Sequence, residues 1–225
     1  MLQHRTVDEL MTRNVVRVRP DTPFKEIVRE LAENDVTAVP VIDPSGRVVG
    51  VVSEADLMRK SADQPDPFGR VAVPSLEAWE RAKAEGARAE ELMSAPPVCA
   101  RPEWNVVETA RLMTTQNVKR LPVVDETDHL VGIISRADIL RVFLREDAAI
   151  RSEIERDLLE RTMGLAPSAV RAEVSEGQVI LTGNVETRST IPLIEHLCRS
   201  VDGVVSVHQR LTYTTDDTGG GFPAA

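Results

Sequence analysis

Residues 7–59 read VDELMTRNVVRVRPDTPFKEIVRELAENDVTAVPVIDPSGRVVGVVSEADLMR, and residues 89–141 read AEELMSAPPVCARPEWNVVETARLMTTQNVKRLPVVDETDHLVGIISRADILR. The two stretches align without a gap at an offset of 82 residues, and 18 of the 53 aligned positions are identical. A repeat of this length indicates one supersecondary unit made twice, with copies that stack to bury a shared apolar face. The identical pairs include Pro40/Pro122, Asp43/Asp125, Gly50/Gly132, Ser53/Ser135 and Asp56/Asp138.

Composition limits the kinds of protein that this chain can be. The 225 residues are 42% hydrophobic and 3% aromatic, so aliphatic side chains must build the cores. A net charge of −9 argues against a nucleic-acid partner, because binding to phosphates requires an excess of Lys and Arg. Cys99 and Cys198 have neither metal-ligand nor disulfide-framework spacing and fit a reducing compartment. Without a signal-peptide-like or membrane-spanning apolar run, we expect a cytoplasmic protein.

The first half of each repeat predicts a strand followed by a helix. Residues 15–18 (VVRV) precede a proline and predict a short strand. Thr22 and Pro23 predict a helix start, because Thr is a good cap and Pro suits the first helical position. In the second copy, Asn105 and Glu108 have the spacing of a capping box.

The second half of each repeat predicts two strands and a second helix. Residues 39–42 (VPVI) form a short apolar run that ends in the turn-forming residues 43–46 (DPSG). Residues 47–52 predict the next strand, and Ser53 opens the last helix. Each repeat therefore has the order β-α-β-β-α, and the chain has an α+β fold.

Residues 60–88 separate the copies and read as a linker. The first part is rich in Pro, Gly and Asp and predicts a loop, whereas residues 76–92 (LEAWERAKAEGARAEEL) predict a charged helix that leads into the second copy. We expect Trp79 to pack against the repeats. The second copy with its final helix extends over residues 89–145.

A third domain follows at residues 147–213, with the predicted order α-β-β-α-β. Residues 147–160 form an amphipathic helix, residues 170–174 and 179–185 alternate as strands around a turn, and residues 191–201 form a second helix that ends at Asp202-Gly203. Residues 205–211 predict the last strand. We expect the tail at residues 214–225 to be disordered.

The Ser-x-x-Asp sequence joins the last strand to the last helix in both copies, as Ser53–Asp56 (the first clamp) and Ser135–Asp138 (the second clamp). One interpretation is a capping box that stabilises the helix start. The other is a nucleotide clamp: a helix N-terminus and a Ser hydroxyl bind phosphate, and a carboxylate one turn later accepts hydrogen bonds from vicinal ribose hydroxyls.

Both copies resemble CBS domains. The resemblance rests on the β-α-β-β-α order, the strands VPVID and LPVVD, and the endings GVVSEAD (residues 50–56) and GIISRAD (residues 132–138). It covers residues 7–141 and implies a CBS pair, or Bateman module, of α/β-like repeats. In that family the cleft between copies holds AMP, ADP, ATP or S-adenosylmethionine. The resemblance also implies a homodimer formed through the pair.

The resemblance implies a role for particular residues of this sequence. Asp56 and Asp138 would bind ribose, and Ser53 and Ser135 would lie near phosphate. The stretches 36–40 and 118–122 would contact adenine, and residues 15–16 and 97–98 would line the cleft. The complete set of implied nucleotide contacts is Val16, Val36, Thr37, Ala38, Pro40, Ser53, Asp56, Val98, Val118, Lys119, Arg120, Pro122, Ser135, Arg136 and Asp138.

The two copies differ in charge around their clamps. The second copy carries Arg136 inside its clamp and Lys119-Arg120 before its apolar strand, where the first has Glu54 and Thr37-Ala38. A phosphate gains a charge-assisted hydrogen bond near Arg136 and meets a like charge near Glu54. We therefore expect the site of the second clamp to bind a phosphorylated ligand more tightly, unless these cations are simply solvated surface charges.

The third domain resembles a BON domain. The resemblance rests on the strand-turn-strand at residues 174–179 (VSEGQV), the motif VILTGNV at residues 179–185, and the Gly203-Val204 step. That family is associated with phospholipid surfaces or protein interaction. From Asp147 onward, 7 Arg and no Lys against 12 Asp and Glu give a charge of −5, which disfavours anionic lipid and favours a protein partner.

Catalysis has little support in the sequence. The four histidines lack ligand spacing, and the chain has no phosphate-binding glycine loop or nucleophile motif, so we expect neither enzyme activity nor a metal or cofactor. Two functions remain. The first is a sensor in which an adenosine ligand changes how the repeats pack and a partner or the third domain responds. The second is a scaffold that dimerises without a ligand, or attaches to phospholipid through the third domain.

Overall fold

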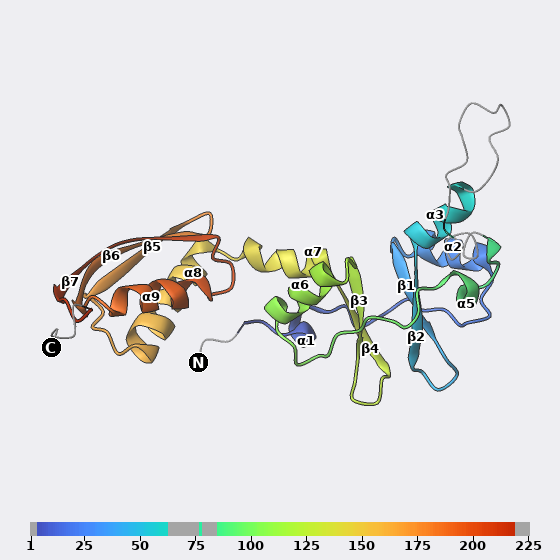
Figure 1. Ribbon diagram of the computed structural model, residues 1–225, viewed down its shortest axis with the longest axis horizontal. Helices are drawn as coiled ribbons and strands as arrows, with labels where there is room; N and C mark the ends of the chain where they lie inside the picture. The colour runs from blue at the N-terminus through green and yellow to red at the C-terminus, as the bar shows by residue number, and fades with distance from the viewer. Residues whose placement is uncertain (1–3, 63–76, 78–84, 219–225) are drawn as a thin grey trace, which may run out of the picture. The chain divides into compact units, whose positions relative to one another are not determined.

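The computed structural model describes residues 4–62, 77 and 85–218, and it divides into two compact units (Figure 1). One unit is Thr6–Arg136, which contains most of both repeats. The other combines Met1–Arg5 with Ala137–Ala225. Across the described residues, no helix is both long and apolar enough to cross a membrane.

The two repeats fold alike. The first contains α1 (Val7–Leu10), α2 (Phe24–Glu33), β1 (Ala38–Ile42), β2 (Val48–Ser53) and α3 (Glu54–Ala62). The second contains α5 (Ala89–Leu92), α6 (Val106–Thr115), β3 (Arg120–Val124), β4 (Leu130–Ser135) and α7 (Arg136–Leu140). Strands β1 and β2 form one antiparallel hairpin and β3 and β4 form another, with the same register and the same irregularity before the turn. The predicted α+β class is confirmed.

The predicted first strand of each repeat is reduced to a single parallel bridge, Val18 with Val41 and Ala100 with Val123. The Val18 N–H donates to the Pro40 carbonyl at 3.0 Å, and the Ile42 N–H donates to the Val18 carbonyl at 2.9 Å. A longer parallel ladder would need N–H donors at Pro40 and Pro20, which proline lacks. The second copy has Pro122 and Pro102 at the equivalent positions, so the same limit applies there.

The two predicted helix starts differ in outcome. Asn105 caps α6 as expected: its Oδ1 accepts from the N–H groups of Val107 and Glu108, and Glu108 accepts in return from the Asn105 N–H at 3.0 Å. The expectation for Thr22 is wrong, because α2 begins at Phe24, one residue later than predicted. The Thr22 hydroxyl instead accepts from the Arg19 N–H at 2.9 Å and closes the preceding turn.

The repeats exchange their N-terminal segments. The Val7 and Asp8 N–H groups in α1 donate to the carbonyls of Trp104 and Pro102 in the second repeat. In the same way, α5 donates to the Thr22 and Pro20 carbonyls of the first repeat, and Leu92 joins its hydrophobic core. Each repeat therefore contributes a segment to the packing of the other, and cutting the chain at the linker would remove these contacts.

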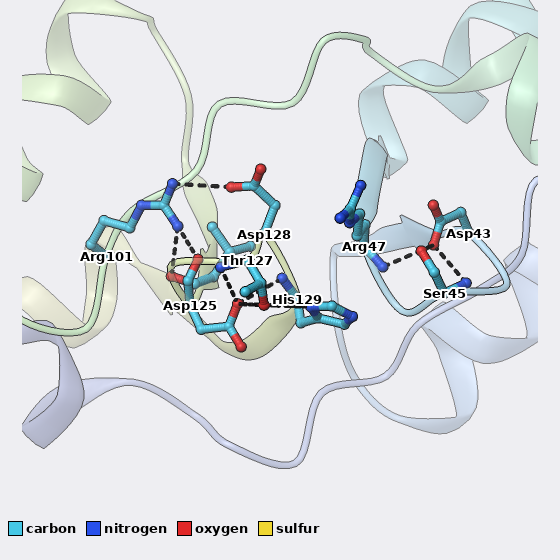
Figure 2. Close-up of polar contacts among 9 residues, drawn as sticks. Asp43, Ser45, Arg47, Arg101, Asp125, Thr127, Asp128 and His129 are labelled. Carbon is cyan, nitrogen blue, oxygen red and sulfur yellow. Dashed lines mark hydrogen bonds and ion pairs between the residues drawn. The ribbon is translucent and has the colours of Figure 1, made fainter.

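The turns of the two hairpins meet, as Figure 2 shows. The Asp43 carboxylate accepts from the Ser45 N–H and hydroxyl and from the Arg47 N–H, and these hydrogen bonds lower its pKa. Asp125 makes the equivalent contacts with Thr127 and His129. A backbone bridge pairs Arg47 with His129, so the turn between β1 and β2 contacts the turn between β3 and β4 and joins the two repeats.

The third domain has the predicted order. A short 3-10 turn η1 (Arg141–Leu144) precedes α8 (Asp147–Ser152), η2 (a π-helix, Glu153–Thr162), β5 (Val170–Ser175), β6 (Gln178–Thr187), α9 (Thr190–Arg199) and β7 (Ser206–Thr215). The sheet order is β5-β6-β7, with β5 antiparallel and β7 parallel to β6. The helices cover one face of this sheet in Figure 1, and the buried core includes Ile154, Leu181, Ile194 and Cys198.

Two boundaries differ from the expectation. Strand β7 ends at Thr215, so the first residues of the predicted tail are ordered; Asp217 accepts from the Ser189 N–H and hydroxyl at the start of α9. Helix α3 extends to Ala62, beyond the expected boundary at Arg59. Most of the predicted linker helix, with Trp79, lies outside the described residues.

Candidate functional site

The first clamp is built at the junction of β2 and α3. The Asp56 carboxylate accepts from the Ser53 N–H at 3.0 Å and from the Ser53 hydroxyl at 2.6 Å, and its second oxygen accepts from the Arg59 guanidinium at 2.8 Å. Asp56 is only 5% exposed. The Asp56 half of the predicted capping box is therefore present, and Arg59 compensates the charge of a carboxylate that burial would otherwise destabilise.

A pocket of about 320 Å³ opens at this clamp. Both repeats contribute to it: β1, β2 and α3 of the first, and the segments before β3 with the first residue of β3 of the second. Its lining residues are Thr37, Ala38, Val51, Ser53, Glu54, Ala55, Asp56, Arg59, Ser94, Pro96, Pro97, Val98, Asn117, Val118, Lys119 and Arg120. The volume lies at the lower end of the range for small-molecule sites.

The pocket combines apolar walls with an excess of positive charge. Pro97, Val98 and Val118 supply apolar surface, and three cations face two carboxylates: Arg59, Lys119 and Arg120 against Glu54 and Asp56. The N-terminus of α3 adds backbone N–H groups and the positive end of the helix dipole. Such a pocket suits a ligand that has a flat apolar part, a diol and an anionic group.

Eight of the predicted contacts line this pocket: Thr37, Ala38, Ser53, Asp56, Val98, Val118, Lys119 and Arg120. Seven do not: Val16, Val36, Pro40, Pro122, Ser135, Arg136 and Asp138. Pro40 and Pro122 are buried inside β1 and β3, where their carbonyls accept the bridge hydrogen bonds. Asp138, 9% exposed, accepts from Arg141 at 3.0 Å, as Asp56 does from Arg59.

Lys119 and Arg120 lie in a different pocket from the one that the sequence suggested. Because they belong to the second repeat, we expected them beside the second clamp. The structure instead places both at the pocket of Ser53 and Asp56, because this pocket is shared between the repeats. Arg136 is exposed, and its Nε donates to the Val118 carbonyl at 3.1 Å.

Sequence reasoning did not identify several pocket residues. Arg59 is the most informative, since it holds the Asp56 carboxylate, and its counterpart Arg141 holds Asp138. The identity of these arginines at the 82-residue offset was the available signal. Ser94 and Asn117 are not identical to their counterparts, Thr12 and Asp35, and the repeat did not indicate them.

The part of the chain that the structure describes offers neither a metal-binding cluster nor an ionised thiol. Among these residues, no cluster of three His, Cys, Asp or Glu side chains is arranged to hold a metal ion. Burial raises the pKa of the Cys99 thiol to about 11 and that of Cys198 to about 12, so both are protonated at neutral pH.

Comparison with known families agrees with this geometry. The model of the CBS domain matches residues 7–63 and 89–145, and the model of the BON domain matches residues 146–215. The chain belongs to the CBS domain family. Its two matched repeats are called CBS1 and CBS2 below, and the third domain is its BON domain. Both resemblances found in the sequence are confirmed.

The CBS pair is similar to proteins of known sequence and structure. CBSX1, a chloroplastic CBS domain-containing protein of Arabidopsis thaliana, is 32% identical over 154 residues, which cover 62% of this chain and 64% of CBSX1. The crystal structure of the related CBSX2 of the same plant, in complex with AMP, is 33% identical with a TM-score of 0.53, and covers 62% of this chain and 96% of that one.

A third structure supports the fold alone. It is the CBS domain pair of protein MJ0100 in complex with 5′-methylthioadenosine and S-adenosyl-L-methionine, 20% identical with a TM-score of 0.51, and it covers 63% of this chain and 97% of that one. The chain thus spans nearly two thirds of the CBSX proteins but almost the whole of the two solved CBS pairs.

Proposed function

We propose that the CBS pair is a non-catalytic sensor that binds a phosphorylated adenosine ligand in the pocket of the first clamp. The observation that carries this proposal is the meeting of Ser53 and Asp56 from CBS1 with Lys119 and Arg120 from CBS2 around one cavity. Because the ligand would contact both repeats, its binding would alter how they pack. A regulated partner would respond to that change.

Each part of the ligand has a chemical counterpart in the pocket. The Asp56 carboxylate is suited to the vicinal hydroxyls of ribose, as acidic residues are in dinucleotide folds. The N-terminus of α3, the Ser53 hydroxyl and the cations Lys119 and Arg120 are suited to phosphate. Pro97, Val98 and Val118 supply an apolar surface for adenine. The AMP complex of CBSX2, at 33% identity, supports this ligand class.

The charge balance favours this pocket over the second clamp for a phosphorylated ligand. Arg59, Lys119 and Arg120 outweigh Glu54 and Asp56 here, so the pocket keeps a net positive charge despite Glu54. Ser135, Arg136 and Asp138, together with Val16 and Val36, remain proposed contacts of a second and weaker site. Among the candidate ligands, AMP and ADP fit this charge better than S-adenosylmethionine, whose sulfonium is positive.

A thermal-shift screen of the full chain tests the proposal. The panel is AMP, ADP, ATP, S-adenosylmethionine and adenosine, each at saturating concentration. A ligand at a hundredfold excess over its Kd stabilises the folded state by about 2.7 kcal/mol, which gives a clear rise in Tm. The absence of a shift with every adenosine ligand would favour the scaffold function, in which the clamps act only as helix caps.

The output of the sensor is also a proposal. We place it in protein contacts of the BON domain, because the net charge of −5 from Asp147 onward disfavours an anionic phospholipid surface. A homodimer formed through the CBS pair is compatible with this role. Sedimentation of the full chain with and without AMP would measure the oligomeric state directly.

A further inference from the structure

Glu54 brings a negative charge into the pocket of the first clamp. It is the first residue of α3, it lines the pocket, and it is exposed. Its backbone is held in place, because the Glu54 N–H donates to the Thr37 carbonyl at 3.0 Å. A phosphate bound at the N-terminus of α3 therefore has a carboxylate beside it, and the two negative charges repel each other.

The positive charge that remains to meet a phosphate is small. Arg59 pairs with the Asp56 carboxylate at 2.8 Å, so these two charges compensate each other within the site. In the part of the chain that the structure describes, neither Lys119 nor Arg120 has a carboxylate within ion-pair distance, and Glu54 has no cation within that distance. The pocket thus offers a phosphate two unpaired cations and one unpaired anion.

Ligands with different numbers of phosphates meet this charge balance differently. The phosphate of a nucleoside monophosphate carries a charge of about −1.5 to −2 at pH 7, which Lys119 and Arg120 can neutralise. Each further phosphoryl group adds an ionised oxygen, and the described lining contains no other unpaired cation to receive it. Glu54 repels that added charge, and so do its surroundings, because residues 6–136 contain 17 Lys and Arg against 22 Asp and Glu, a charge of −5.

The internal repeat carries the opposite charge at the same position. The equivalent of Glu54 is Arg136, whose N–H donates to the Lys119 carbonyl at 3.0 Å, as the Glu54 N–H does to the Thr37 carbonyl. The junction of strand and helix therefore forms with either an acid or an arginine at its first helical residue. The charge at Glu54 can be changed without changing the fold of the clamp.

We propose that Glu54 determines ligand specificity by making the pocket select a nucleoside monophosphate over the corresponding di- and triphosphates. This inference rests on the proposed function, because it concerns the phosphate of the same ligand in the same pocket. Lys119 and Arg120 attract the first phosphate, and Glu54 weakens the binding of every further one. The pocket volume of about 320 Å³ agrees with a small ligand.

Titration calorimetry of the full chain with adenosine, AMP, ADP and ATP in magnesium-free buffer tests this selection. The deciding quantity is the ratio of the Kd for ATP to the Kd for AMP. We expect AMP to bind the unmodified protein at least about fivefold more tightly than ATP, and Glu54→Gln to lower this ratio about threefold. Glu54→Arg, which introduces the residue of the second repeat, should lower the ratio further.

Glu33→Gln is the matched control, because it removes the same charge from the exposed end of α2. It should leave the ratio unchanged, and every variant should bind adenosine as the unmodified protein does, which shows that the pocket remains folded. Equal affinities for ATP and AMP in the unmodified protein, a ratio that Glu54→Arg leaves unchanged, or an equal change in Glu33→Gln would overturn the role of Glu54 while the nucleotide site stands. The absence of binding by all four ligands would contradict the proposed function as well.

Discussion

At the scale of single residues, Asp56 can serve both as a helix cap and as a ligand contact. Its carboxylate accepts from the Ser53 N–H and hydroxyl, as a helix-capping acid does, and pairs with Arg59. A ribose diol can share the same carboxylate, because each carboxylate oxygen accepts more than one hydrogen bond. The two interpretations are therefore compatible, and a cap at this position also orients a ligand contact.

Lys119 and Arg120 provide the first test at this scale. The variant Lys119→Thr/Arg120→Ala gives CBS2 the residues that CBS1 has at the same positions. We expect its affinity for AMP to fall at least about tenfold, because charge-assisted hydrogen bonds contribute roughly 1.5–3 kcal/mol each, and its affinity for adenosine to change little. Isothermal titration calorimetry measures both ligands.

Lys25→Thr/Arg29→Ala is the matched control for that variant, because it makes the same change of net charge on the exposed face of α2. It should bind AMP as the unmodified protein does. Equal losses in the two double variants would show that AMP responds only to the overall charge of the protein.

Cys198 gives a prediction for the dependence of stability on pH. Burial raises the pKa of its thiol from the usual value near 9 to about 12 in the folded state. Below pH 9 the thiol is protonated in both states, and its contribution to stability is complete. Between pH 9 and about 12 the unfolded state loses the proton first, so the contribution falls by about 1.4 kcal/mol per pH unit.

Urea unfolding of the unmodified protein and of Cys198→Ala, monitored in the BON domain between pH 8 and 10.5, measures this contribution. The free-energy difference between the two proteins should be constant up to about pH 9 and shrink above it. A difference that stays constant over the whole range would contradict the assigned pKa.

At the scale of secondary structure elements, the sequence predicted helices and hairpins better than single strands. The β-α-β-β-α order, the Asn105 capping box and the α-β-β-α-β order of the BON domain follow from periodicity and turn residues, which act locally. The prediction of a first strand in each repeat was wrong, because its ladder needs N–H donors from a strand distant in sequence. Pro40 and Pro122 lack these donors. The sequence also did not predict that Lys119 lines the pocket of Ser53 and Asp56. The local sequence does not show which repeat a segment faces.

The contact between β2 and the exchanged segment gives a prediction at this scale. Gly50 in β2 lies directly against the Met93 side chain, and its counterpart Gly132 lies against Met11. A Cβ at Gly50 would overlap Met93, so Gly50→Ala should destabilise the CBS pair by about 1–3 kcal/mol. Chemical denaturation measures the loss.

Shortening the Met93 side chain makes room for the methyl group that Gly50→Ala adds. The double variant Gly50→Ala/Met93→Ala should cost less than the sum of the two single variants, because the two side chains compete for one space. Strict additivity of the two costs would show that Gly50 is required for a reason other than this contact.

At the scale of the whole molecule, the repeat explains why one pocket contains residues from both copies. Backbone hydrogen bonds of α1 and α5 hold CBS1 and CBS2 together, and the hairpin turns at Asp43 and Asp125 form a second contact between them. The pocket is formed by the first clamp together with the segments before β3 and Arg120, the first residue of that strand. A ligand there would change the packing of the pair rather than of one repeat.

The central claim is that the pocket of Ser53 and Asp56 is the principal site for a phosphorylated adenosine ligand. Titration calorimetry with AMP on the full chain, compared between Asp56→Ala and Asp138→Ala, tests it most directly. We predict that Asp56→Ala lowers the affinity at least about tenfold and Asp138→Ala lowers it less, since the cations Lys119 and Arg120 line the pocket of Asp56. AMP binding that survives Asp56→Ala unchanged, or that fails only in Asp138→Ala, would contradict the claim.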